Sequence, residues 1–455
     1  MPAETSPKAK PTAQPAKPPV HIEVWYDVRD GSYWYQLNGR FLQLKKSDLF
    51  LNITRSFGIT HKSQYFEGLS PLDWIIVNAQ HNRQIDYAGA LAGHHVGIFK
   101  DGSGRSYLVT DEARGVFDDL PKSFDEPEFF AEFVCELLPG EQAQYFFYWL
   151  AIALRSLRKG DFRPGQVVVL AGPVQCGKSL LQSMVTEILG GRAASPMRYM
   201  MEETTFNRDL AGAEHWPIEE PKTSTDTRTR IQFGNAIKEC FNNQLFSIHA
   251  KGKEAISLPL WRRGTISLNN EPDLLMVLPP LNGSVDDKMM LFNCDRVEKS
   301  IAFATVNGEQ DRAKLWGRFM GELVNIRAWL LASFKKVPKA MKDTRFGVLA
   351  YHHPELRKEL AAFTSEMRLL NIIDEGFFTG DGPHANKTGK AMALERELRQ
   401  SPTGFEADKL LRYANQFASL LGKLNKLHPE RVSKSVKDGY TTWTIHPPSQ
   451  QTPAF

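Results

Sequence analysis

The chain has 455 residues, of which 42% are hydrophobic and 24% are charged, and its formal net charge is +4. This length predicts two to four domains, and the composition is typical of a globular protein. No run approaches the roughly 18 apolar residues that span a bilayer, so we expect no membrane association. A net charge this small does not by itself indicate nucleic acid, and the location of the charges matters more.

The N-terminal residues and the cysteines both bear on the cellular compartment of the protein. Residues 1–19 are rich in Pro, Ala and Lys and lack aromatic residues, which predicts a disordered tail and no signal peptide. Four cysteines are scattered singly, without a disulfide framework or a CxxC zinc pattern: Cys135, Cys176, Cys240 and Cys294. We therefore expect a cytoplasmic protein in a reducing compartment.

Residues 20–121 carry the pattern of a small, mostly β module. Aromatic runs such as Ser32–Leu37 alternate with polar residues, and Asp30-Gly31 and Asn38-Gly39 are hairpin turn signals. The Trp and Tyr side chains in these runs are of a kind that also stacks on bases. Packing between strands is the commoner role of such residues, and we favour it here.

The rest of the chain divides by its periodicity. Residues 122–161 have helical spacing, and 162–340 alternate strands and helices, which predicts a largely parallel α/β core. We interpret 341–390 as a helical segment and linker and 448–455 as a tail. Residues 391–447 read as three helices followed by two strands about Asp438-Gly439.

A phosphate-binding loop follows the apolar run Val167–Ala171. The pattern GxxxxGK followed by Ser needs its glycines so that backbone N–H groups wrap a phosphate at a helix N-terminus. Lys178 would reach the β- and γ-phosphates and Ser179 would bind Mg²⁺. The predicted ATP-binding residues are Gly172, Pro173, Val174, Gln175, Cys176, Gly177, Lys178 and Ser179.

Two later segments supply polar groups of the kind that ATP hydrolysis needs. Glu219 and Glu220 end a short apolar segment. We assign Glu219 to the metal side and Glu220 to the general base. Asn269 follows a third strand-like segment, where an amide is able to hydrogen-bond both the γ-phosphate and the lytic water. A simple turn at Asn269–Pro272 is the alternative reading.

With these three elements in this order, residues 162–294 resemble a superfamily 3 helicase, closest to the poxvirus primase-helicase type carried by phages and other mobile elements. The resemblance implies an AAA+-like P-loop core that assembles as a ring, usually a hexamer, with ATP sites between subunits. It also implies 3′ to 5′ movement on single-stranded DNA. In this family the third motif ends in Asn with a Pro shortly after it, which selects Asn269 over Asn270.

The same family places a β-hairpin with a basic tip between the second and third motifs. Here His249, Lys251 and Lys253 fit that tip and would grip the backbone of single-stranded DNA. An ordinary polar turn is the alternative. The family's trans-acting arginine is missing from its usual place, where this chain has Lys288. Arg296 and the pair Arg262-Arg263 are alternatives for that role.

Three helices and a terminal hairpin over 391–447 describe a winged helix, a helix-turn-helix variant. Basic residues dominate the third helix and the hairpin, where such a domain meets duplex DNA. The candidate DNA contacts are Lys423, Lys426, Arg431, Lys434 and Lys437. Many winged helices bind proteins, and that role is the alternative.

The function that joins these features is an ATP-dependent DNA helicase for replication of a phage or mobile element. Residues 20–121 lack an obvious metal-binding carboxylate pair, so we expect priming or initiation by a separate protein. An ATP-switched DNA-binding regulator without unwinding activity is one rival. A P-loop kinase or transferase is the other, but it has no use for a basic hairpin.

Overall fold

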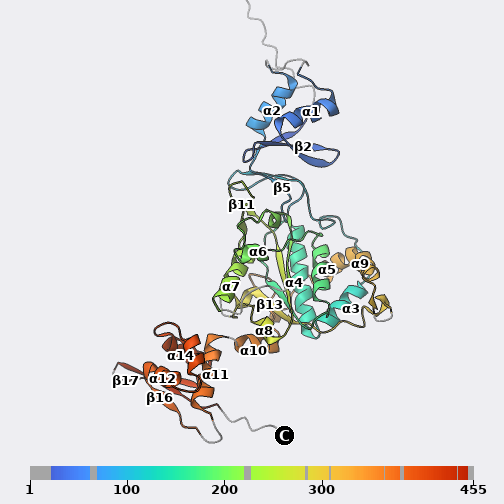
Figure 1. Cartoon of the computed structure of the whole chain (residues 1–455). Helices are drawn as coiled ribbons and strands as arrows, with labels where there is room; N and C mark the ends of the chain where they lie inside the picture. The colour runs from blue at the N-terminus through green and yellow to red at the C-terminus, as the bar shows by residue number, and fades with distance from the viewer. Residues whose placement is uncertain are drawn as a thin grey trace, which may run out of the picture.

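The computed structural model describes residues 22–61, 69–219, 227–281, 285–306, 309–362, 364–379, 384–437 and 439–448. Three bodies follow one another along the molecule (Figure 1): an N-terminal module, a central α/β core, and a C-terminal module at the opposite end. No helix within the described ranges is long and apolar enough to cross a membrane.

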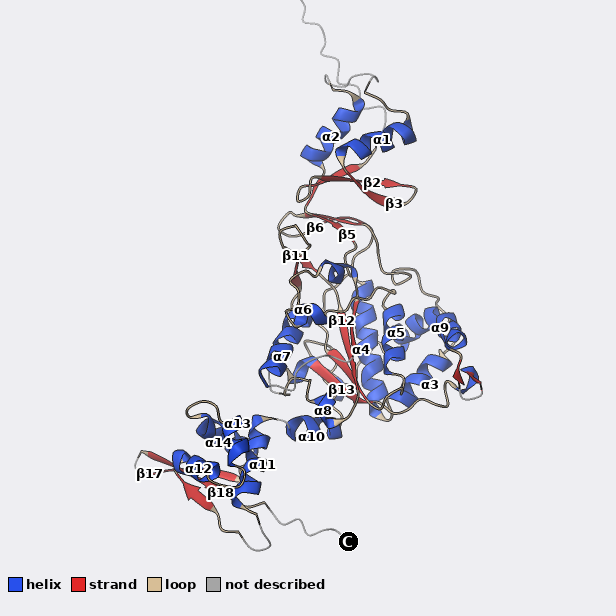
Figure 2. Ribbon diagram, in the orientation of Figure 1, coloured by secondary structure: helices blue, strands red, loops and turns tan. Residues whose placement is uncertain are grey.

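The N-terminal module is an α/β unit, which corrects the expectation of a mostly β module. Its sheet has the order β3-β2-β1-β4, and two helices cover one face (Figure 2). Tyr33 and Tyr35 on the sheet pack against Leu49 and Ile53 of the first helix, so these aromatics are core residues. The elements are β1 (Val24–Asp27), β2 (Ser32–Leu37), β3 (Arg40–Leu44), α1 (Lys46–Phe57), α2 (Pro71–Asn82) and β4 (Gln84–Ile85).

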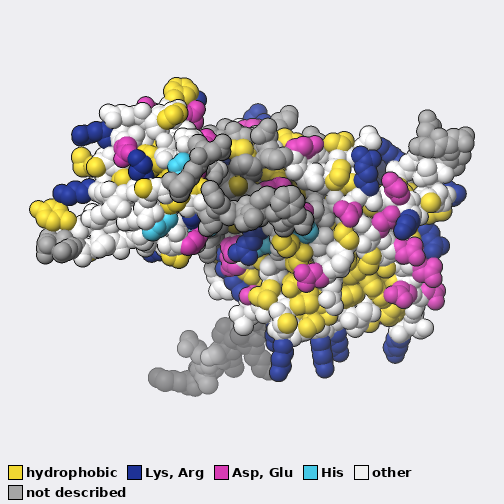
Figure 3. Space-filling model, turned by 90° about the horizontal axis from the view of Figure 1, so that it is seen from below, with side chains coloured by type: hydrophobic (Ala, Val, Ile, Leu, Met, Phe, Trp, Pro, Cys, Tyr) yellow, Lys and Arg dark blue, Asp and Glu magenta, His cyan; other side chains and the backbone are white. Residues whose placement is uncertain are grey.

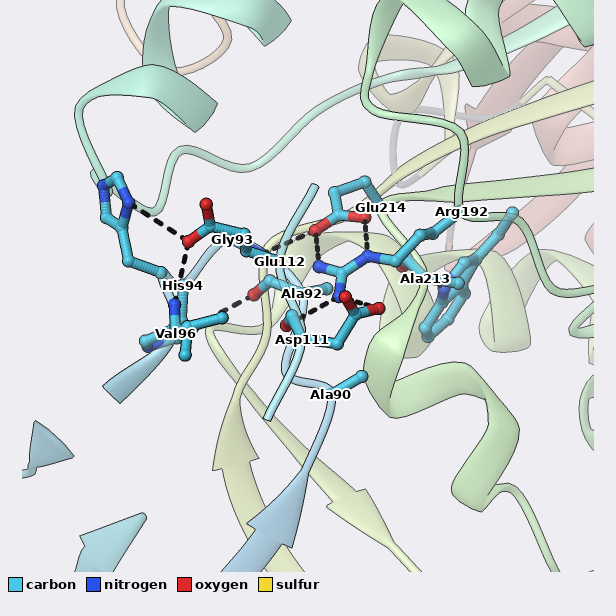
Figure 4. Close-up of polar contacts among 12 residues, drawn as sticks. Ala90, Ala92, Gly93, His94, Val96, Asp111, Glu112, Arg192, Ala213 and Glu214 are labelled. Carbon is cyan, nitrogen blue, oxygen red and sulfur yellow. Dashed lines mark hydrogen bonds and ion pairs between the residues drawn. The ribbon is translucent and has the colours of Figure 1, made fainter. Parts of the chain in front are cut away.

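A second small sheet lies between this module and the core. It has the order β5-β7-β6 and consists of β5 (Tyr87–Gly89), β6 (Gly97–Lys100) and β7 (Ser106–Val109). A buried ion pair ties the neighbouring loops to the core (Figure 4): Glu214 accepts from Arg192 Nε at 2.9 Å and from the Gly93 N–H at 3.0 Å. Arg192 also donates to the Asp111 carbonyl at 2.9 Å. These contacts attach the loops of the N-terminal segment to Glu214, the residue directly before the core strand His215–Glu219.

The core is built on a four-stranded, all-parallel sheet of order β13-β8-β12-β9. Every residue of β8 is buried, because alternate side chains enter the hydrophobic clusters on the two faces. Val168 and Leu170 point to one cluster and Val169 to the other, which explains a continuous apolar run in place of alternation. The strands are β8 (Val167–Ala171), β9 (His215–Glu219), β12 (Arg263–Leu268) and β13 (Met289–Asn293).

Helices cover both faces of this sheet (Figure 2). One face is covered by α3 (Glu128–Leu137), α4 (Glu141–Arg158), α5 (Lys178–Ile188) and α9 (Arg312–Ser333). The other is covered by α6 (Met197–Met200), α7 (Thr227–Asn242) and α10 (Pro354–Ala362). The helices at 122–161, expected as a lead-in, therefore share the hydrophobic core of the α/β domain.

A two-stranded antiparallel hairpin and several short elements complete the core. The hairpin pairs β10 (Leu245–Ile248) with β11 (Ile256–Pro259), and its tip is formed by 249–255. The short elements are η1 (Arg208–Gly212), α8 (Pro272–Leu275), η2 (Asp286–Lys288), η3 (Ala302–Ala304), β14 (Thr305–Val306), β15 (Glu309–Gln310) and η4 (Lys339–Met341).

The C-terminal module has its own hydrophobic cluster and a three-stranded antiparallel sheet of order β16-β18-β17. Leu369 and Ile373 of the first helix lie in this cluster, so the module begins earlier than the expected boundary at 391. The elements are α11 (Ser365–Phe377), β16 (Lys387–Gly389), α12 (Ala391–Arg399), α13 (Gly404–Leu410), α14 (Gln416–Leu427), β17 (Val432–Lys437) and β18 (Tyr440–Ile445).

Candidate functional site

The loop between β8 and α5 has the tight curvature that an anion-binding loop needs. Gln175 has φ of 61° and Gly177 has φ of 116°, so the backbone turns through the left-handed region twice. Gly172 has no room for a side chain, because a Cβ there would lie 2.6 Å from the Cys294 carbonyl oxygen. The strand and helix expected on either side are present, and α5 begins at Lys178. Backbone N–H groups at such a turn form a concave site for phosphate.

Lys178 lies folded onto this loop. Its ammonium donates to the carbonyl oxygens of Gly172 at 2.8 Å and Pro173 at 2.6 Å, and to Asn269 Oδ1 at 3.3 Å. The residue is only 8% exposed. Asn269 follows the end of β12, the strand beside β8, so the amide and the ammonium meet at one edge of the sheet. A bound anion would replace the loop carbonyls as the acceptor of the hydrogen bonds that Lys178 donates.

Buried polar contacts fix the helix that carries Lys178. Gln182 Nε2 donates to Thr265 Oγ1 at 2.8 Å, which ties α5 to β12. The His215 ring lies between Thr186 Oγ1 at 2.7 Å and Thr265 Oγ1 at 2.9 Å, so it links β9, α5 and β12. Complete burial lowers the pKa of His215 to about 3, which keeps the ring neutral. The three segments that carry Lys178, Glu219 and Asn269 are therefore held in register.

These segments open into a cleft with a volume of about 1830 Å³ at the carboxyl ends of the parallel strands. Its lining includes Ser179, Glu219 and Asn269, together with Val174 to Lys178 of the loop. Gly172 and Pro173 reach the site through their carbonyl bonds to Lys178. Glu220, the expected general base, lies outside the described residues.

The donor set of the cleft fits Mg²⁺. The Ser179 hydroxyl and the Glu219 carboxylate offer hard oxygen atoms, and both residues line the cleft. Magnesium in nucleotide sites is typically held by one or two protein groups plus phosphate and water.

Sequence reasoning missed the far wall of the cleft. Gln310 of β15 and Arg312 and Trp316 at the start of α9 line it, and no motif marks them in the sequence. The loop that precedes this wall is held by Glu136, whose carboxylate accepts from the N–H groups of residues 298, 299 and 300 at 2.7–2.9 Å. These hydrogen bonds lower the pKa of Glu136 to about 2, although partial burial acts to raise it. The wall contributes a cation, Arg312.

The basic hairpin tip touches the N-terminal module. Lys253 forms an ion pair with Asp30, and Arg29 donates to the carbonyl oxygens of Glu254 and Ala255. His249 is half-buried, and its N–H donates to Asn207 Oδ1 at 2.7 Å. Lys251 is exposed at the turn. One of the two tip lysines is therefore already paired within the chain.

The candidates for a trans-acting cation lie in three different settings. Lys288 precedes β13, at the edge of the sheet opposite the phosphate loop, and its ammonium contacts Asp287 at 2.5 Å. Arg296 is exposed just beyond the other end of β13. Arg262 and Arg263 are buried and donate to carbonyls inside the core, including those of Cys240 and Arg262 itself. Burial removes the Arg262-Arg263 pair from this role.

The basic residues of the C-terminal module are not equivalent. Lys426 and Lys434 are exposed, while Lys423 contacts Glu366 at 2.6 Å. Arg431 pairs with Asp374 of α11 and is mostly covered, so it holds the sheet to a helix. The side chain of Lys437 lies outside the described residues.

Seen from below, Lys and Arg side chains project from the rim of the molecule, with acidic side chains interspersed (Figure 3).

Comparison with known proteins finds similarity in shape alone. No family model and no curated protein matches the sequence. Two apo structures of the NrS-1 C-terminal region superpose with a TM-score of 0.55; they are 15% and 14% identical and cover 93% and 94% of this chain and 95% and 96% of theirs. A structure of JCV helicase with a bound compound has a TM-score of 0.26 at 11% identity over 54% of this chain and 61% of that one, too low to establish a shared fold. The chain therefore shares its fold with the NrS-1 C-terminal region along nearly its whole length.

Proposed function

We propose that the chain is an ATP-dependent DNA helicase of the superfamily 3 type that serves replication of a phage or mobile element. The observation that carries the proposal is the cleft in which Lys178, Glu219 and Asn269 meet at the carboxyl ends of three neighbouring parallel strands. Ligands of open α/β sheets bind at this edge. A charged lysine, a carboxylate and an amide around one phosphate-sized loop suit hydrolysis of a triphosphate.

Each residue has a distinct task in this proposal. Lys178 leaves the loop carbonyls and neutralises charge on the β- and γ-phosphates, and Asn269 orients the γ-phosphate and the attacking water. Ser179 and Glu219 would hold Mg²⁺, and the metal would supply neutralisation of phosphate charge. Glu220 acts as the general base, and Lys288 or Arg296 supplies a cation to the neighbouring subunit's nucleotide.

DNA movement falls to the hairpin tip. ATP hydrolysis at subunit boundaries of a hexameric ring would shift the tip formed by His249, Lys251 and Lys253 along one strand, in the 3′ to 5′ direction. A basic tip contacts phosphate and carries no base readout, which suits tracking along any sequence. The exposed Lys251 supports this role, and the Lys253–Asp30 pair would open when DNA enters.

The C-terminal module would hold duplex DNA as a winged helix. Its sheet order, β16-β18-β17, and the helices α12, α13 and α14 support this reading. In a winged helix the last helix and the hairpin face DNA, and here they carry Lys426 and Lys434, both exposed. Priming and initiation would come from a separate protein.

Strand displacement tests the proposal. The full chain is mixed with a forked DNA duplex with and without ATP, beside Lys178→Ala and, as a matched control, the exposed Lys159→Ala. We expect ATP-dependent unwinding by the wild type and Lys159→Ala, and loss of ATP turnover of at least about 100-fold in Lys178→Ala with the fold intact. Rings seen by negative-stain imaging with a non-hydrolysable nucleotide would agree with the motor.

Three results contradict the proposal. Normal turnover in Lys178→Ala removes the phosphate-loop assignment. DNA binding without unwinding favours a regulator that uses ATP as a switch. Phosphoryl transfer to a small acceptor, independent of DNA, favours a P-loop kinase.

A further inference from the structure

Two cysteines meet at the floor of the phosphate loop. Cys176 belongs to the loop itself, and Cys294 comes directly after β13, the strand beside β8. Both are buried, and neither forms a disulfide. The Cys294 N–H donates to the Ala171 carbonyl at 2.6 Å, so the sheet fixes its backbone next to the start of the loop. The hydrolysis described above uses neither thiol.

The missing side chain at Gly172 shows how close the two residues are. A Cβ placed on Gly172 would lie 2.7 Å from the Cys294 Cβ and 3.2 Å from the Cys176 sulfur. The Cys294 side chain and the Cys176 sulfur therefore both lie next to the backbone at Gly172. A glycine here lets the two cysteine side chains approach each other.

The surroundings make Cys176 the nucleophile and Cys294 its partner. The Cys176 sulfur lies 3.7 Å from Lys178 Nζ. The hydrogen bond from Cys294, together with the positive charge of Lys178, lowers the pKa of Cys176 to about 6 against the effect of burial. Burial and the neighbouring Cys176 raise the pKa of Cys294. Cys176 is one of the residues that line the cleft.

We propose that Cys176 and Cys294 form an oxidation-sensitive pair, and that closure into a disulfide locks the phosphate loop against nucleotide. The oxidant is a peroxide. The Cys176 thiolate attacks one peroxide oxygen, the O–O bond breaks, and a sulfenic acid forms. Cys294 then attacks that sulfur, the new S–S bond displaces the hydroxyl as water, and the two thiol protons end in water. Two thiols and one hydrogen peroxide give one disulfide and two waters.

The consequence for nucleotide binding rests on the proposed function. A disulfide would tie the middle of the loop to the end of β13, and the loop would lose the freedom to shape its N–H groups around a phosphate. Bound nucleotide would in turn cover Cys176 and slow the oxidation. The pair thus connects the oxidation state of the surroundings to ATP use.

The experiment treats the full reduced chain with hydrogen peroxide, with and without Mg²⁺ and a non-hydrolysable ATP analogue. Peptide mapping under non-reducing conditions should find Cys176 joined to Cys294, less so with nucleotide present. Binding of a fluorescent ATP analogue should weaken by at least about tenfold after oxidation and return after thiol reduction. Cys294→Ala, which keeps the Cβ, should bind nucleotide, form no such crosslink, and retain a sulfenic acid on Cys176 that dimedone traps.

Controls come from the other cysteines. Cys135→Ala removes the exposed thiol and should leave the crosslink unchanged, and Cys240 should stay reduced because burial raises its pKa to about 12. If Cys294→Ala does not fold, as judged by circular dichroism, Cys294→Ser replaces it. The proposal that Cys176 and Cys294 form a disulfide is contradicted if Cys176 stays free or links to Cys135 or Cys240. The proposal that the disulfide prevents nucleotide binding is contradicted if the crosslinked chain binds nucleotide as the reduced chain does. Reduced protein that binds no nucleotide defeats the proposed function instead, because the crosslink is measured without it.

Discussion

The phosphate-loop cleft and the C-terminal module both depend on lysines, but they hold them differently. Lys178 is buried against carbonyl oxygens, and its helix is fixed by Gln182 and His215. In the C-terminal module Lys426 and Lys434 lie on the surface. A buried cation is prearranged for one ligand and costs energy when its partner is removed, whereas an exposed one acts through long-range attraction that salt weakens. Mutations in the cleft should therefore have larger and more specific effects than mutations in the C-terminal module.

The largest effect should come from the carboxylate of the cleft. Glu219→Gln keeps the size of the side chain but removes the charge that would hold Mg²⁺, so nucleotide should still bind while turnover falls by about 10²–10³-fold. Single-turnover hydrolysis and equilibrium binding measured on the same preparation separate these quantities. Glu239→Gln, an exposed change on α7, is the control. Equal loss of binding and turnover would assign Glu219 a structural role.

A second large effect should appear in stability. Glu214→Gln leaves Arg192 charged in a buried position, so we expect the free energy of unfolding to fall by about 3–5 kcal/mol. Arg198→Gln breaks a surface pair with Glu203 and should cost about 1 kcal/mol or less. Denaturant unfolding of the two variants gives the comparison directly. Similar values for both would mean that the Arg192–Glu214 ion pair does not hold the N-terminal segment to the core.

In the C-terminal module the expected effect is on salt dependence. Replacing Lys423, Lys426 and Lys434 with Ala should lower the slope of log affinity against log salt by about 0.9 for each DNA phosphate that the protein no longer neutralises. The pairing of Lys423 with Glu366 predicts that its share is the smallest. A triple change of Lys335, Lys336 and Lys339 alters the charge equally at a site away from this module. An unaltered slope in the first variant would favour a protein-binding role for the module.

The smallest effect should come from the hairpin tip. Asp30→Asn frees Lys253 from its ion pair, and the energy of such a pair, about 0.2–1 kcal/mol, predicts single-stranded DNA binding up to about five times tighter at low salt. Fluorescence anisotropy measures this change. Asp48→Asn removes the same charge from an exposed site in the same module. Weaker binding, or an equal gain in Asp48→Asn, would rule out competition between Asp30 and DNA.

The phosphate loop, Glu219 and Asn269 were predictable because each follows an apolar strand, and parallel strands bring their carboxyl ends to one edge. The helices α1 and α2 were missed because their neighbours carry strong strand and turn signals, while α1 is stabilised by burying Leu49 and Ile53 against the sheet. Such stabilisation by tertiary packing does not show in local propensity.

The sequence by itself determined the local chemistry: a glycine-bearing loop after a buried strand, and the acidic and amide groups that follow two others. Only the tertiary structure decided which distant residues come together: Cys294 lies beside Cys176 at the loop, Arg312 lines the same cleft, and Asp30 pairs with Lys253 at the hairpin tip. Local periodicity reports the conformation of neighbouring residues. Contacts between distant segments depend on how the strands are ordered and the helices packed, and one sequence carries no direct record of that order.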